Sequence, residues 1–206
     1  MKLTQAKESG FTLIEILISV ILLTILAGAV LSIQFIISQN QVSVFQNYLT
    51  VEDSNSVVSI FARELRNAKE ADDGSFPLVT LSDQEIIFYS DYDFDGEVER
   101  IRYTLTGTSL TKATIEPTDP PISYPVNSES IKVITNYVRN GASPIFYYYN
   151  KDWPQDTINN PLALASRLSD TQLVKIALTL NTKASDPVKD YTIESFIQIR
   201  MVKEND

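Results

Sequence analysis

The chain has 206 residues and a formal net charge of −9, and it contains neither cysteine nor histidine. Without these residue types it can form no disulfide, no Ser–His or Cys–His catalytic pair and no zinc site of the usual ligands. The excess of acidic residues argues against a surface that follows phosphates, so no contact with nucleic acid is predicted. A structural or binding role is therefore favoured over an enzyme.

The segment from Phe11 to Ile37 is apolar except for a few small polar residues and one glutamate. As a helix it spans about 40 Å, against about 30 Å for the hydrocarbon core of a bilayer. Lys2 and Lys7 precede it, which places the N-terminus in the cytoplasm and the rest of the chain outside. The segment predicts a single-pass protein of the cytoplasmic (inner) membrane.

Two simple interpretations of this segment stay open. One is a plain membrane anchor. The other is a secretory signal peptide, because Ala27-Gly28-Ala29 fits the A-x-A cleavage pattern, although the apolar core is long and hydrophobicity resumes after the supposed cut. In both, Glu15 is an unexplained carboxylate within an apolar segment, where a charge costs about 3 kcal/mol.

The stretch SGFTLIEILISVILL combines a polar leader ending in Gly10, a phenylalanine, a glutamate five positions after that glycine, and an apolar run. It resembles the class III signal of type IV pilins and type II secretion pseudopilins. The resemblance implies that a prepilin peptidase cleaves between Gly10 and Phe11 and methylates the new amino terminus of Phe11. It also implies that Glu15 meets the amino terminus of a neighbouring subunit, a pairing that makes both buried charges tolerable.

Apolar residues continue at helical spacing beyond the membrane segment. The stripe consists of Val42, Phe45, Tyr48, Leu49, Val58, Phe61, Leu65 and Ala68. No proline precedes Pro77, so the pattern predicts one helix from about Phe11 to about Ala71. Its first part, residues 11–37, belongs in the membrane or a filament core, and its amphipathic part, residues 38–71, packs on a folded head.

After Gly74, alternating β-branched and aromatic residues predict antiparallel strands. These are LVTL, EIIFYS, EVERIRYTL, SLTKATI, SIKVITNYV, PIFYYY, LVKIALTL and YTIESFIQIRMV. The expected fold class is α+β and pilin-like, with one long N-terminal helix packed on an antiparallel β-sheet head. Residues 1–10 are then the leader, and residues 72–206 form the extracytoplasmic head.

The stretch SDYDFDGEVERIRY has two interpretations. A plain hairpin would use Asp95-Gly96 as its two-residue turn. That turn would pair Phe88 with Tyr103, Ile86 with Leu105 and Asp91 with Arg100. The other interpretation is a calcium site.

Carboxylates at alternate positions before a glycine resemble the start of a D-x-D-x-D-G calcium loop. An EF-hand is excluded, because the twelfth position counted from Asp91 is Arg102 instead of glutamate. Calcium is therefore the one cofactor that the sequence suggests. Its ligands would be Asp91, Asp93, Asp95 and either Glu97 or Glu99.

The stretch IIFYSDYDFDGEVERIRYTLTGTSL and the strands VKIALTL and FIQIRMV resemble J-type minor pseudopilins and W-type minor pilins. This resemblance implies a minor subunit of a type IV pilus or type II secretion pseudopilus, with other pilin or pseudopilin subunits as partners. The alternative function is a membrane-anchored extracellular binding protein, with or without calcium, that does not assemble.

Overall fold

The computed structural model describes residues 10–181 and 190–200. Within the long helix, the side chains of residues 42, 43, 45–47, 49, 50, 53 and 54 are not described. Residues 1–9 of the predicted leader therefore lie outside the described part. The same is true of three side chains of the predicted stripe, those of Val42, Phe45 and Leu49. The chain divides into two compact units, residues 1–46 and 47–206, which are taken in turn.

The first unit holds the N-terminal part of helix α1 (Leu13–Arg66). Of the helices that the structure describes, only the section Leu13–Gln41 is long and apolar enough to cross a membrane. Its 29 residues correspond to about 43 Å. The hydroxyls of Ser19, Thr24 and Ser32 donate to backbone carbonyls one turn earlier, at 2.7–2.8 Å. These polar groups are thus satisfied within the helix, as hydrocarbon surroundings require.

The second unit contains two antiparallel sheets. The first has the order β1 (Leu78–Leu81), β2 (Glu85–Ser90), β3 (Glu99–Thr106), β4 (Ser109–Ile115) and β5 (Ser130–Thr135). The second has the order β6 (Phe146–Tyr149), β7 (Leu173–Leu180) and β8 (Tyr191–Gln198). Short helices are η1 (Val126–Ser128), η2 (Leu164–Ser166) and α2 (Arg167–Asp170). Each predicted strand is present in the described part, but β5, β6 and β8 are shorter than predicted, and residues 201–202 of the last predicted strand lie outside that part. The α+β, pilin-like architecture is confirmed.

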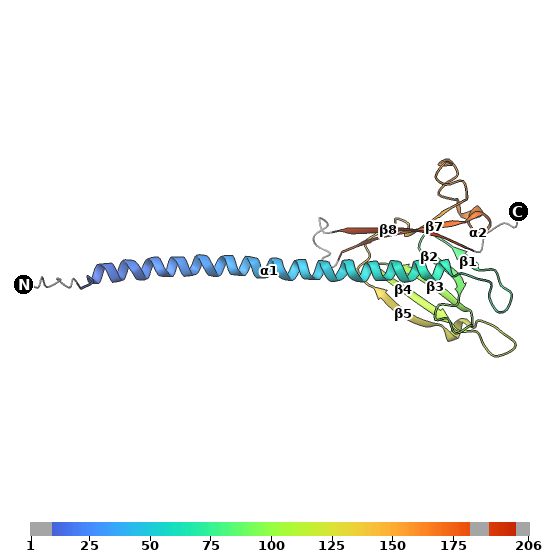
Figure 1. The fold of residues 1–206 in the computed structure, drawn as a ribbon, viewed down its shortest axis with the longest axis horizontal. Helices are drawn as coiled ribbons and strands as arrows, with labels where there is room; N and C mark the ends of the chain where they lie inside the picture. Colours follow the sequence, from blue (N-terminus) through green and yellow to red (C-terminus); the bar gives the residue numbers. More distant parts are fainter. Residues whose placement is uncertain (1–9, 182–189, 201–206) are drawn as a thin grey trace, which may run out of the picture. The chain divides into compact units, whose positions relative to one another are not determined.

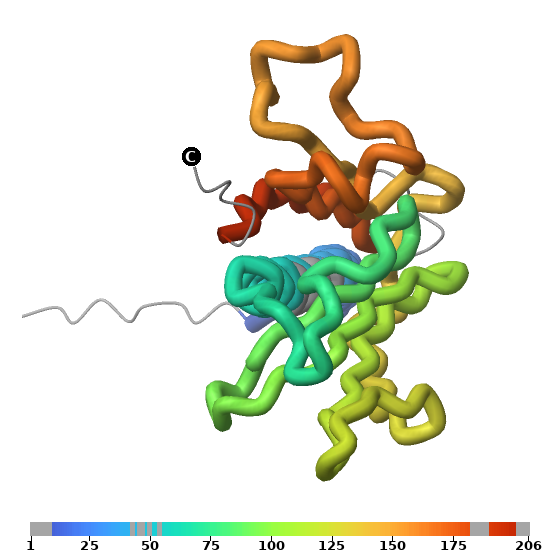
Figure 2. Tube along the Cα trace, turned by 90° about the vertical axis from the view of Figure 1, so that its right-hand side faces the viewer, coloured from blue at the N-terminus to red at the C-terminus, as the bar shows by residue number. Residues whose placement is uncertain are grey.

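Within this unit, the C-terminal part of α1 lies between the two sheets (Figures 1 and 2). Phe61 is fully buried there, with its ring centroid 5.0 Å from that of Tyr103 in the first sheet and 5.4 Å from that of Phe146 in the second. The predicted stripe is confirmed for Val58, Phe61, Leu65 and Ala68, which are all buried. Tyr48 is exposed, contrary to the prediction.

Helix α1 ends at Arg66, five residues before the predicted end at Ala71. Ala68 instead forms an isolated antiparallel bridge with Ser90, and the Lys69 N–H donates to the Tyr89 carbonyl at 3.1 Å. The backbone hydrogen bonds of this segment go to the sheet, so a tertiary contact overrides the local helical pattern.

The β2–β3 register differs by two residues from the predicted hairpin. Phe88 pairs with Ile101 and Ile86 pairs with Tyr103, so residues 91–98 form a longer loop in place of a two-residue turn. In this register Tyr89, and not Asp91, faces Arg100, and the Asp91 carboxylate binds Lys69 at 3.2 Å. A shift of two residues keeps each side chain on its face. Ile86, Phe88, Tyr103 and Leu105 therefore still share one face, and all four belong to the main hydrophobic core.

A buried carboxylate ties α1 to the first sheet. Glu64 is 2% exposed, and it accepts hydrogen bonds from the Tyr103 hydroxyl at 2.8 Å and the Lys112 ammonium at 2.6 Å. Lys112 also lies over the ring of Tyr92, 4.1 Å from its centroid. One acidic side chain of the helix therefore binds strands β3 and β4 together.

Replacing Glu64 by alanine is expected to lower the free energy of unfolding by about 2 kcal/mol, because a charge-assisted bond is lost and the Tyr103 hydroxyl is left without its partner. The measurement is urea unfolding of the detergent-solubilised full chain, followed by fluorescence of its single tryptophan, Trp153. Glu52, which is exposed on the same helix, provides the control. If Glu52→Ala and Glu64→Ala have equal effects, the buried contact contributes nothing specific.

Candidate functional site

The first candidate site is the start of α1. Gly10, Phe11 and Thr12 precede the first helical residue, and the Phe11 side chain is 85% exposed. The peptide bond between Gly10 and Phe11 is thus outside the helix. Residues 1–9, on the other side of that bond, lie outside the described part.

Glu15 and Thr12 form a capping box at this helix start. The Glu15 Oε2 atom accepts from the Thr12 backbone N–H at 2.8 Å and from the Thr12 hydroxyl at 2.8 Å, and the Glu15 N–H donates to Thr12 Oγ1 at 3.4 Å. This arrangement satisfies backbone donors that a helix start leaves unpaired. Our sequence analysis missed this role, although the spacing T-x-x-E before an apolar run indicates it.

The bonds within the capping box involve only one of the two carboxylate oxygens of Glu15. Both bonds from Thr12 end on Oε2, which leaves the Oε1 side of the carboxylate for another partner. A carboxylate in the first helical turn is also favoured by the partial positive charge of the helix N-terminus. The geometry therefore places a carboxyl group in the first turn of α1, close to Phe11 in the chain.

The second candidate site is the acidic loop, which we define as the connecting residues 91–98 together with Glu99, the first residue of β3. Carboxylate oxygens of Asp91, Asp93 and Glu99 all lie within 4.8 Å of one another. The other two predicted ligands, Asp95 and Glu97, do not belong to this group and are exposed. The Asp95 Oδ1 atom accepts from the Glu97 N–H at 2.9 Å.

Negative charge is concentrated at this loop. Burial raises the pKa of Glu99 to about 7, and the charges of Glu116 and Asp93 add to the rise, against the lowering effect of the Tyr92 N–H bond. Burial, followed by the charges of Asp93 and Asp95, also raises the pKa of Glu116. The loop therefore brings together carboxylates that resist simultaneous ionisation unless positive charge is added.

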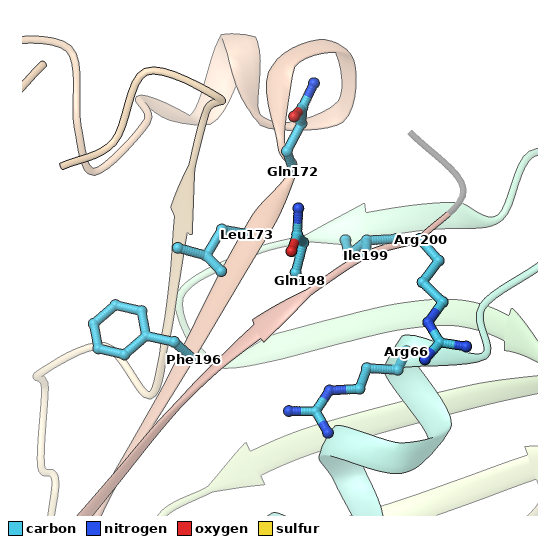
Figure 3. A pocket seen from close by; sticks show the side chains of 7 residues that line it. All are labelled: Arg66, Gln172, Leu173, Phe196, Gln198, Ile199 and Arg200. Atoms are coloured by element: carbon cyan, nitrogen blue, oxygen red, sulfur yellow. The ribbon is translucent and has the colours of Figure 1, made fainter. Parts of the chain in front are cut away.

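The second unit also contains an open cavity of about 810 Å³ at the end of β8 (Figure 3). Its lining residues are Arg66, Gln172, Leu173, Phe196, Gln198, Ile199 and Arg200. The two arginines come from the end of α1 and from the segment after β8 (Figure 3). No spacing in the sequence predicts this cavity, because its lining comes from three separated segments.

Comparison with known proteins bears on the first site alone. Residues 5–31 match the family described as the prokaryotic N-terminal methylation motif. The matched segment includes Gly10, Phe11 and Glu15 and ends within α1. No curated protein matches the chain. Such a motif implies processing by a prepilin peptidase and assembly with other pilins. At its N-terminus, the chain thus carries the prokaryotic methylation motif that is typical of type IV pilins and pseudopilins.

Proposed function

We propose that the protein is a minor pilin or pseudopilin, a structural subunit of a type IV pilus or type II secretion pseudopilus. The supporting observation is the methylation motif at residues 5–31, which leads into an apolar helix long enough to cross a bilayer. The pilin-like α+β architecture adds to this support. The role is one of assembly and not of catalysis.

The proposed life cycle begins in the cytoplasmic membrane. The section Leu13–Gln41 crosses the bilayer and the head lies on the outer side. A prepilin peptidase then cleaves after Gly10 and methylates Phe11. In the filament, the apolar part of α1 packs against other subunits, and the Phe11 amine of one subunit pairs with Glu15 of another.

The assignment as a minor subunit rests on the resemblance of two regions to J-type pseudopilins and W-type pilins. The first region forms the β2–β3 pair with its acidic loop, and the second forms the pair β7–β8. The subunit proposal itself rests on the N-terminal motif and does not depend on this finer assignment.

Processing is tested by the intact mass of the membrane-extracted protein. The expected N-terminus is Phe11 carrying one methyl group. Gly10→Val is expected to keep the leader, because the proposed cleavage follows a glycine and valine places a branched side chain at that position. A Cβ atom at Gly10 meets nothing within 4 Å, so this substitution probes recognition without disturbing the fold.

Gly28→Ala is the matched control, since a Cβ atom there also meets nothing within 4 Å. This variant is expected to be processed normally. A wild-type protein that begins at Met1, or at Val30 after a signal-peptidase cut, would overturn the proposal.

A further inference from the structure

We propose that the acidic loop between β2 and β3 is a calcium site, with Asp91, Asp93 and Glu99 as its protein ligands. This inference goes beyond the role of a filament subunit and does not depend on it. It selects Glu99 from the two glutamates that the sequence offered, and it leaves out Asp95.

The distances suit one calcium ion. Calcium binds oxygen ligands at about 2.3–2.6 Å, so two oxygens on opposite sides of the ion are about 4.6–5.2 Å apart. The oxygens of Asp91, Asp93 and Glu99 lie within 4.8 Å of one another. All three can therefore contact the same ion with little movement of the loop.

Each ligand is fixed through one of its two oxygens. Lys69 binds Asp91 Oδ2 at 3.2 Å, the Tyr92 N–H donates to Glu99 Oε2 at 3.0 Å, and the Asp95 N–H donates to Asp93 Oδ1 at 3.4 Å. These bonds orient the carboxylates without using the remaining oxygens. The loop is thus a set of pre-positioned ligands.

The remaining oxygens of the two inner ligands lack a hydrogen-bond donor. Glu99 is fully buried, and its Oε1 atom accepts no hydrogen bond from the N–H and O–H donors that the structure describes, while the carboxyl group of Glu116 lies within hydrogen-bonding reach of the Glu99 carboxyl. The buried Oδ1 atom of Asp91 likewise accepts no hydrogen bond from these donors. A buried carboxyl oxygen without a hydrogen-bond donor is costly, and a bound cation would interact favourably with such oxygens.

The chemistry of the ligands favours calcium over other metals. All are carboxylates, and the chain has no histidine or cysteine to hold a transition metal. Magnesium requires near-ideal octahedral geometry at shorter distances, whereas calcium accepts an irregular loop with six to eight oxygens. Asp93 is exposed, so water can reach the ion and complete its coordination.

The test uses the full chain in detergent, freed of metal with EDTA and dialysed. Isothermal titration calorimetry with calcium chloride is expected to show one binding site per chain. Titration with magnesium chloride is expected to show much weaker binding. Thermal unfolding, followed by Trp153 fluorescence, should shift upward by about 5–10 °C at calcium concentrations about 100-fold above Kd. Absence of both the binding heat and the shift would overturn the proposal.

Variants locate the site. Glu99→Gln is expected to weaken calcium binding at least about 10-fold, because it removes a charged ligand that is fixed in place. Asp93→Asn should weaken it similarly, and because Asp93 is exposed, this variant keeps the test valid if Glu99→Gln fails to fold. Glu97→Gln, an equal change of charge in the same loop, is expected to bind as the wild type does. Equal binding by all three variants would refute the site, whatever the outcome for processing and assembly.

Discussion

Replacing Glu15 by alanine is expected to lower incorporation into filaments about 100-fold while leaving membrane insertion intact. In the proposed filament, this change leaves the Phe11 ammonium of a neighbouring subunit buried without an anion. Breaking a buried ion pair in this way costs about 3–5 kcal/mol, and every 1.4 kcal/mol is a factor of about ten in affinity. The measurement is the ratio of sheared filament-bound protein to membrane-bound protein in cells that carry the assembly machinery.

A Thr12→Val variant separates the assembly role of Glu15 from its capping role. It removes the hydroxyl that bonds to Glu15 and costs the helix start about 1 kcal/mol, but it keeps the carboxylate. We expect Thr12→Val subunits to be incorporated nearly as well as the wild type. Equal losses in the two variants would make Glu15 a helix cap only. Normal incorporation of Glu15→Ala would show that Glu15 is dispensable, and no incorporation of the wild type would favour an anchored binding protein.

Phe61→Ala is expected to cause the largest loss of stability in the second unit, about 4 kcal/mol. The Phe61 ring is fully buried between the sheets, in edge contact with Phe88 and Tyr103 on one side and close to Phe146 on the other. Its removal leaves a cavity where the helix and both sheets meet. Thermal unfolding of the full chain in detergent, followed by Trp153 fluorescence, should show a fall of about 10 °C in Tm.

Ile60 provides the control for this prediction. It is the preceding residue of α1 and is also a large apolar side chain, but it is 40% exposed. Ile60→Ala is expected to lower the free energy of unfolding by less than about 1.5 kcal/mol, since much of its surface already contacts solvent. If both variants lower Tm equally, helix propensity and not the shared core would govern the stability of this segment.

Local patterns in the sequence determined the elements and their faces. The spacing of Val58, Phe61 and Leu65 predicts the buried face of α1, and the alternation in ERIRYTL predicts which residues of β3 are buried. These predictions succeeded because helical and strand periodicity depend only on neighbouring residues. The same holds for the N-terminal motif, whose residues lie within one short stretch. The T-x-x-E spacing of the helix cap is likewise a local pattern.

The tertiary structure alone decided where elements end and which carboxylates meet. Helix α1 ends at Arg66 because Ala68 and Lys69 bond to the β2 backbone, a partner that no local pattern shows. The β2–β3 register depends on how the loop satisfies its own polar groups, so a two-residue turn inferred from Asp95-Gly96 failed. Likewise, the sequence supplied five acidic candidates, but only folding brought Glu99 beside Asp91 and Asp93. The physical reason is common to all three: contacts that form only in the folded chain outweigh the preferences of each short stretch taken alone.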